Sequence, residues 1–260
     1  MKFTIIVVLA WSLLFSCIEN RELPYNGLLA EPGYFIECYL VPNDRYKLTA
    51  TKLQPLYDDY ILDYSLEFDV RIDTLKLWQG LFRENNSDYV FNYRHSYRFE
   101  PSNKTSIDVQ VITPEMDTVV ATTTIPEEID ILNEKRTGDD ISFGFELSEQ
   151  GWHNYFMINI NTAQKDTTFR KVRFLDYSHM NTRDTVNINY TVLNSETFDR
   201  IEIILRRITK ANYDYQISLE NAKDANSDNL ILPSPLAGNL KNATGIFTCF
   251  TRDSVVWNRE

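Results

Sequence analysis

Cys17 is the residue whose setting points most directly to a chemical reaction. Its thiol ends an apolar run and precedes a polar stretch, in the sequence LLFSCIENRE. Lys2 places a positive charge before the run, and residues 3–15 are almost wholly apolar. A run of this length is typical of a signal peptide and is too short to span a bilayer comfortably.

The tetrapeptide LFSC explains why the run ends on a cysteine. An ordinary secretory signal ends on small residues in an A-x-A-like pattern, whereas LFSC resembles the bacterial lipobox. In that motif the thiol is linked to diacylglycerol before cleavage, and the new amino terminus is then acylated. We predict a lipoprotein signal peptide at 1–16, lipidation of Cys17 and a tether at 17–30. The alternative is an ordinary signal with an incidental cysteine.

Histidine and carboxylate spacings offer little catalytic chemistry. His95, His153 and His179 have no partner at the spacing of a zinc-binding helix, and no nucleophile elbow, P-loop or C-x-x-C motif occurs. The carboxylates are many but scattered, so a pair for glycoside hydrolysis cannot be assigned. We expect no cofactor and no enzymatic activity, and a cell-envelope hydrolase is the least favoured alternative.

The stretch DANSDN is the best candidate for a metal site. Asp224, Asn226 and Asp228 match positions 1, 3 and 5 of a calcium-binding loop. The glycine and the bidentate glutamate of such a loop are replaced by Asn229 and Pro235. The stretch is therefore a weak candidate, and we expect a solvated helix end and turn without bound metal.

Two further residue patterns could carry binding or modification. Tryptophans with fifteen tyrosines could form a stacking platform for a sugar or peptide, although such residues more often fill cores. Four Asp-Thr/Ser-apolar tripeptides and one Asp-Thr-Thr resemble bacterial O-glycosylation sites, but Asp-Thr-Val also starts strands well, and both interpretations stay open. The weak ligand-binding candidates are Trp78, Trp152 and Trp257, and the candidate glycosylated residues are Thr74, Thr118, Thr167, Thr185 and Ser254.

The elements that must position these residues are mostly strands. Apolar and polar residues alternate with period two in many short runs separated by turn-rich pieces, and the last such run is GIFTCF. Pro126, followed by two glutamates, is poor material for a central strand. We predict an immunoglobulin-like β-sandwich over 31–126 and a second β-rich domain over 127–260.

One stretch has a helical period instead. Ala211, Tyr215, Leu219 and Ala222 fall on one face of a helix, which we predict over 209–225. We expect this helix to bury Tyr215 and Leu219 against a sheet.

The net charge and the cysteines indicate which partners and which compartment to expect for this protein. The net charge of −11 argues against a nucleic-acid partner. No second apolar stretch approaches membrane-spanning length, so the lipid is the expected membrane anchor. Cys38 and Cys249 alternate with apolar neighbours and are expected to be small buried hydrophobes. A disulfide between them would be allowed in an exported protein and is left open.

Four stretches together resemble a known family. The lipobox is followed by an acidic stretch, and YFIECYLVPNDRYKLTATK is similar to the family's first strand pair. VQVITPEMDTVVATTTIPEEID is similar to its strand, turn, strand and proline linker, with Met116 and Asp117 where glycine is usual. LRRITKANYDYQISLENA and SPLAGNLKNATGIFTCF are similar to its closing strand, helix, proline loop and final strand, where Gly245 is the remaining glycine. The family is the Bacteroidota outer-membrane lipoproteins catalogued as domain of unknown function 4249.

The resemblance implies an outer-membrane lipoprotein, on the periplasmic or the cell-surface face. Such proteins are often encoded beside TonB-dependent transporters. We therefore expect a lipid-anchored accessory protein that binds a TonB-dependent transporter or its ligand. The alternative is a surface module that binds a glycan or a peptide.

The anchor gives the first testable prediction. Cys17→Ala removes the sulfur that accepts the lipid, so we expect no incorporation of radiolabelled palmitate and an uncut or released protein. Labelling of Cys17→Ala at the level of the wild type would contradict the lipobox interpretation.

Overall fold

The computed structural model describes residues 33–53, 64, 66–84, 89–101, 104–165, 167–227 and 235–259. The signal peptide predicted at 1–16, the tether predicted at 17–30 with Cys17, and Asp228 lie outside these residues. Contacts group residues 32–260 into one unit, and the fold below is that of this unit.

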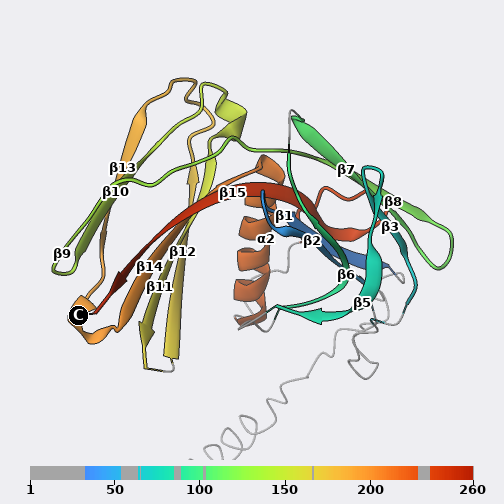
Figure 1. Cartoon of the computed structure of the whole chain (residues 1–260), viewed down its shortest axis with the longest axis horizontal. Coiled ribbons are helices and arrows are strands. Elements are labelled where there is room, and N and C mark those ends of the chain that lie inside the picture. Colours follow the sequence, from blue (N-terminus) through green and yellow to red (C-terminus); the bar gives the residue numbers. More distant parts are fainter. Residues whose placement is uncertain are drawn as a thin grey trace, which may run out of the picture. The chain divides into compact units, whose positions relative to one another are not determined.

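One long sheet of eight strands dominates the described residues (Figure 1). Its strands alternate buried and exposed side chains, as a sheet with differently covered faces requires. In order across the sheet, the strands are β12 (Thr167–Asp176), β11 (Tyr155–Gln164), β14 (Arg200–Ile208), β15 (Thr244–Asn258), β1 (Tyr34–Leu40), β2 (Arg45–Lys52), β6 (Val90–Arg98) and β5 (Trp78–Arg83).

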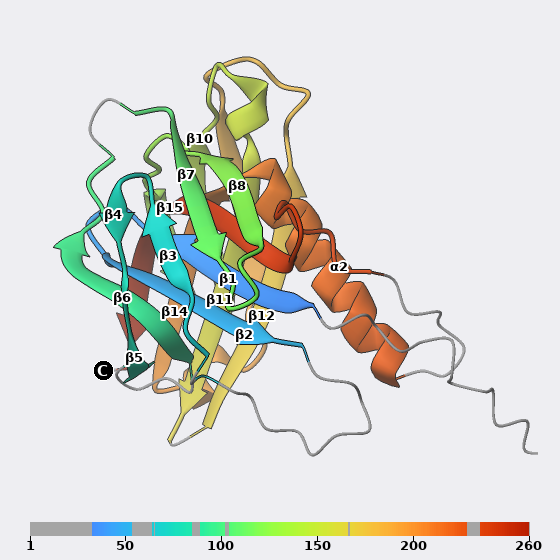
Figure 2. The same cartoon turned by 90° about the vertical axis from the view of Figure 1, so that its right-hand side faces the viewer.

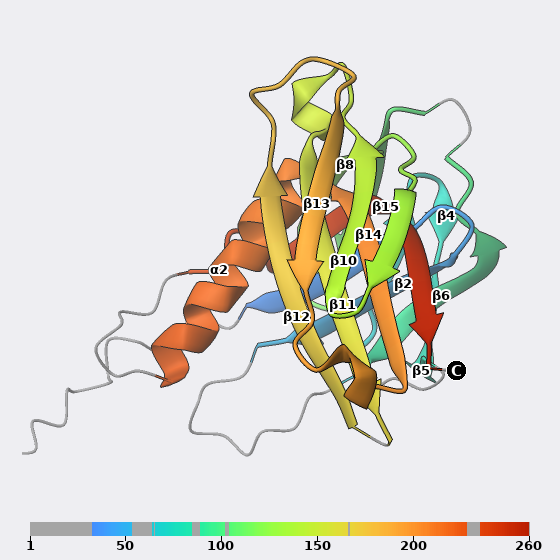
Figure 3. The same ribbon diagram turned by 90° about the vertical axis from the view of Figure 1, so that its left-hand side faces the viewer.

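Two smaller sheets complete the β structure, and Figures 2 and 3 show them from the outside. The four-stranded sheet contains β4 (Leu75–Lys76), β3 (Asp69–Ile72), β7 (Ser106–Ile112) and β8 (Thr118–Thr124). The three-stranded sheet contains β13 (Thr185–Thr191), β10 (Asp140–Glu146) and β9 (Leu132–Thr137). In the described part of the chain, the helical elements are α2 (Lys210–Ser227) and the short 3₁₀ turns η3 (Gly151–His153) and η4 (Ser195–Thr197).

These elements confirm the predicted fold class, a mainly β protein with a helix near its C-terminus. None of the described helices has the length and hydrophobicity needed to cross a bilayer.

β15 joins the two parts of the long sheet. The first part contains β1, β2, β6 and β5, and the second contains β12, β11 and β14. The first residues of β15, from Thr244 to Cys249, pair in parallel with β1, and the rest, from Phe250 to Asn258, pair antiparallel with β14. Figure 1 shows it in dark red, running from the strands of the first part to those of the second. The predicted final strand, GIFTCF, is therefore only the first half of the observed one.

The alternation of side chains along β15 decides what covers each face. Phe247 and Cys249 lie in a core shared with the four-stranded sheet, while Val255 and Trp257 pack against a core shared with the three-stranded sheet. Because these four positions are all odd, both small sheets cover the same face. The even positions face α2: Thr248 bonds to Thr209 at the helix start, and Phe250 packs with Tyr213.

The connection between the two small sheets is held by the long sheet. Glu127 lies in this connection. Its backbone carbonyl accepts a hydrogen bond from the Thr251 hydroxyl at 2.6 Å. Its carboxylate forms an ion pair with Arg207 at 3.3 Å. Arg207 is 4% exposed and also donates to the carbonyls of Glu128 and Glu146. The predicted boundary at Pro126 lies between the two cores, but separate folding of the two parts stays a prediction.

α2 begins and ends within two residues of the predicted helix, at Lys210 and Ser227. Tyr215 is buried as predicted, but the expectation of a buried Leu219 is wrong, because that side chain is partly exposed. The buried face instead carries Asn212 and Ser218. These polar side chains can be buried because Ser218 Oγ accepts a hydrogen bond from the N–H of Ala237 and donates one to a helix carbonyl.

The two remaining cysteines are fully buried and free. Burial raises the pKa of both thiols, that of Cys249 to about 12, so neither is a reactive thiolate at neutral pH. The prediction that Cys38 and Cys249 are small buried hydrophobes is confirmed.

Backbone conformation explains where the family pattern needs glycine. Met116 occupies the turn position where glycine is usual and has a φ of +72°, a left-handed conformation that costs a non-glycine residue about 1 kcal/mol. Gly245 has a φ of +115°, and a Cβ atom there would lie 2.0 Å from the carbonyl oxygen of Ile36. Gly245 therefore allows β15 to pair closely with β1.

This contact predicts a large loss of stability for Gly245→Ala, about 3 kcal/mol or more, because the new methyl group clashes with the β1 backbone. Gly138→Ala is the matched control: Gly138 also has a positive φ, but nothing lies within 4 Å of its Cβ position, so we expect about 1 kcal/mol. Urea unfolding measures both. Equal losses would show that the close approach to β1 is unimportant.

Candidate ligand groove

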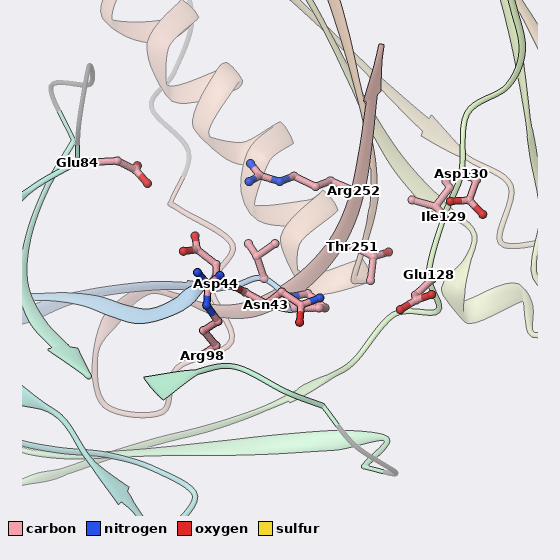
Figure 4. A pocket seen from close by; sticks show the side chains of 11 residues that line it. Asn43, Asp44, Glu84, Arg98, Glu128, Ile129, Asp130, Thr251 and Arg252 are labelled. Atoms are coloured by element: carbon pink, nitrogen blue, oxygen red, sulfur yellow. Dashed lines mark hydrogen bonds between the residues drawn. The ribbon is translucent and has the colours of Figure 1, made fainter. Parts of the chain in front are cut away.

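Two adjoining hollows lie where the two parts of the long sheet meet. They share the lining residues Val41, Asp44, Glu84 and Arg252, so they form one continuous junction groove. The hollows have volumes of about 500 and 340 Å³. Figure 4 shows the larger one, with Glu84 and Arg252 reaching into it from opposite sides. Strands of both parts and the helix therefore contribute to one site.

The smaller hollow is rich in arginine, and we call it the arginine hollow. Its arginines are Arg170 on β12, Arg206 on β14 and Arg252 on β15. The strand register places Arg206 directly opposite Arg252. Like charges directly opposite each other destabilise a strand pair. The charges of Arg206 and Arg252 therefore repel each other at this point of the sheet.

Arg206 is the most buried of the three. Its guanidinium lies 5.4 Å from the centre of the Phe250 ring, a cation–π distance. Burial, followed by repulsion from Arg170 and Arg252, lowers its pKa to about 10. The group therefore stays charged at neutral pH. Its Nε and Nη1 atoms are buried and have no hydrogen-bond partner in the described part of the chain.

The two carboxylates that line the arginine hollow are already bound to a lysine. Lys47 Nζ lies 3.0 Å from Asp44 Oδ2 and 2.7 Å from Glu84 Oε1. Burial disfavours the charged form of Asp44, but hydrogen bonds from Lys47 and from the N–H of Arg45 outweigh it and lower the pKa of Asp44. A general acid working near neutral pH needs a raised pKa, so Asp44 does not suit that role.

The helix forms a polar wall beside the arginines. Gln216 Nε2 donates to the hydroxyl of Tyr39 at 3.2 Å, and that hydroxyl donates to Glu37 Oε1 at 2.9 Å. Burial raises the pKa of Glu37, although hydrogen bonds from Tyr39 and Tyr215 oppose this. Tyr39, Gln216 and Asn212 line the arginine hollow, so this wall faces any ligand held there.

The three tryptophans predicted as weak ligand-binding candidates lie on separate elements. Trp78 on β5 is 55% exposed and contacts the ring of His95, and Trp152 in η3 is 48% exposed and contacts the ring of His153. Trp257 lies near the end of β15 and packs partly against the second core. None of them lines the junction groove, so the described structure does not unite them in one platform.

The weak metal candidate falls at the end of a helix. Asp224 and Asn226 belong to the last turn of α2, which is helical rather than looped, and Asp228 lies outside the described residues. The loop conformation that calcium ligands at positions 1 and 3 require is therefore absent at 224 and 226.

The predicted O-glycosylation residues are all exposed. Three of them are the first residues of strands, as the strand-start interpretation expects, and a fourth lies in the turn before β4. Exposure also leaves them accessible to modification, so both interpretations remain. The strand-start residues are Thr118, Thr167 and Thr185, the turn residue is Thr74, and Ser254 lies within β15.

Sequence reasoning missed the arginine hollow. The alternating stretch RIEIILRRI carries a signal, because period two puts Arg206 on the face opposite Leu205 and Arg207. The other two arginines come from strands 36 residues before and 46 residues after it. Nothing local in the sequence shows that the three meet.

Adjacent arginines on opposite faces give a matched test. Arg206→Met should stabilise the unliganded protein by about 1 kcal/mol, because it removes an unpaired, partly buried charge facing another arginine. Arg207→Met should destabilise it by about 1–3 kcal/mol, because the carbonyls of Glu128 and Glu146 and the partly exposed Glu127 lose their partner. Urea unfolding at low salt measures both. A loss of stability in Arg206→Met would contradict this account of the groove.

Comparison with known protein families gave a match over most of the chain. The family model described as "Domain of unknown function (DUF4249)" matches residues 21–255. A search of curated proteins found no match. The family match takes in every strand of the long sheet and both small sheets, apart from the last residues of β15. The chain therefore belongs to the DUF4249 family.

Proposed function

We propose that this protein is a lipid-anchored accessory protein of the bacterial outer membrane that binds a ligand in the junction groove. The anchor is Cys17, in the lipobox-like tetrapeptide LFSC. The ligand is one that a TonB-dependent transporter takes up, and the protein works beside that transporter. The resemblance to Bacteroidota outer-membrane lipoproteins supports the location and the partner.

The observation that carries this proposal is the set of unpaired arginines in the groove. Within the described residues, the guanidinium groups of Arg170, Arg206 and Arg252 form no ion pair or hydrogen bond. A sheet gains no stability from such a cluster. In a binding site the same cluster becomes favourable once an anionic ligand is bound, because the ligand supplies the missing partners.

Binding is favoured over catalysis by the two acids that both hollows share, Asp44 and Glu84. Hydrolysis by paired carboxylates needs one acid with a raised pKa and one that stays ionised. Asp44 and Glu84 both contact Lys47, and the pKa of Asp44 is lowered. This pair cannot divide the two roles between them. A hydrolase is therefore the weakest of the three functions.

A glycan or peptide is a second candidate ligand, and the same groove would hold it. Tyr39, Tyr89 and Phe250 line the arginine hollow and give it an aromatic surface. Sugars and peptides commonly stack on such rings. In this alternative the aromatic contacts to the ligand come from the groove and not from the three separated tryptophans.

The partner is tested by crosslinking in intact cells. Tagged full-length protein is crosslinked, purified from solubilised envelopes and examined by mass spectrometry. We expect a TonB-dependent transporter in the wild-type sample and at least a fivefold loss in Arg170→Glu, because ligand and transporter are engaged together. Arg173→Glu is the matched control, since Arg173 is exposed on the other face of the same strand.

Two results would overturn the proposal. One is the absence of any transporter from the wild-type sample. The other is equal capture by the Arg170→Glu and Arg173→Glu variants, which would separate the transporter contact from the groove.

A further inference from the structure

We infer that Arg170, Arg206 and Arg252 form a binding site for a phosphoryl group carried by the ligand. This rests on the proposed function only in taking the junction groove as the ligand site. Three strands, β12, β14 and β15, bring the guanidinium groups to one hollow of about 340 Å³.

The positive charge in the hollow is not balanced by the protein. Four cationic side chains and two acidic ones line it, an excess of two positive charges in a chain whose net charge is −11. Asp44 and Glu84 are engaged by Lys47. Glu202, the other acid that influences Arg206, is engaged by Arg200 at 2.9 Å and by Asn161 at 3.1 Å. The two carboxylates that line the hollow, and that of Glu202, thus already have partners.

The number of arginines favours a tetrahedral anion over a carboxylate. A carboxylate has two oxygens and is satisfied by one guanidinium fork. A phosphate monoester has three free oxygens, which can accept hydrogen bonds from three separate guanidinium groups. Its charge of about −1.5 to −2 at pH 7 also matches the excess of positive charge better than a single carboxylate does.

Contacts within the hollow hold Arg206 in place before a ligand arrives. Arg206 lies over Phe250 and beside Met157, its neighbour across the β11–β14 pair. The same face of β11 carries Asn159, whose Oδ1 is buried and without a partner in the described structure. Fixed donors bind with a smaller entropy loss than mobile ones. The wall formed by Tyr39 and Gln216 is left to contact the group that carries the phosphate.

The test measures binding to the purified full-length protein in detergent by isothermal titration calorimetry. The probes are inorganic phosphate, glucose 1-phosphate, dihexanoyl phosphatidic acid, sulfate and acetate. We expect phosphate compounds to bind at least tenfold more tightly than acetate. Their affinity should fall as the pH drops below about 6, because the phosphate then loses its second charge. It should also fall with added salt.

Variants assign the binding to the three arginines. Arg252→Ala and Arg170→Ala should each weaken glucose 1-phosphate binding at least tenfold, while Arg173→Ala should leave it unchanged. Phosphate should raise the melting temperature of the wild type but not that of Arg206→Met. Equal affinities for acetate and glucose 1-phosphate, or unchanged binding in Arg252→Ala, would overturn the inference.

Comparison of the probes identifies the source of the phosphoryl group. Tighter binding of dihexanoyl phosphatidic acid indicates a lipid headgroup, and tighter binding of glucose 1-phosphate indicates a phosphorylated sugar; either result supports the site. Capture of a transporter by a protein that binds no phosphate compound would refute this inference and leave the proposed function standing. Phosphate binding without transporter capture would refute the proposed function and leave this inference standing.

Discussion

The pairing of β15 with both β1 and β14 is the constraint on which the rest of the structure depends. The strand is long enough to pair in parallel with one part of the sheet and antiparallel with the other. Gly245 permits the first pairing, because any side chain there would meet the β1 backbone. Without this strand the two cores would have no common sheet, and the junction groove would have no floor.

The two-residue period of β14 and β15 then divides structural from binding roles. On one face, Arg207 is buried, pairs with the partly exposed Glu127 and holds the connection between the small sheets. On the other face, Arg206 meets Arg252 with no acidic partner in the described structure. Adjacent residues of the same type are thus expected to have opposite effects on stability. The physical difference is whether the protein itself supplies the counter-charge.

The unpaired arginines also relate the site to the acidic character of the chain. A protein with a net charge of −11 repels anions at long range. It can bind one only where cations are gathered. The arginine hollow meets this condition, because its cations outnumber its carboxylates by two and both carboxylates already contact Lys47. The proposed site would therefore select a small anion and would not bind acidic polymers broadly.

The amino-acid sequence by itself determined the local features of this protein: the mainly β character, the helix near the C-terminus and the burial of Cys38 and Cys249, because period, composition and neighbours fix these over short distances. The sequence-based prediction was wrong for Leu219, because the buried face of α2 carries polar residues that bond to a distant partner. It also missed the second half of β15, which pairs with a strand far away in the sequence. Only the tertiary structure placed Arg170, Arg206 and Arg252 together and left three tryptophans apart. Strand order decides such meetings, and strand order depends on pairing between residues far apart in the chain, which no local pattern records.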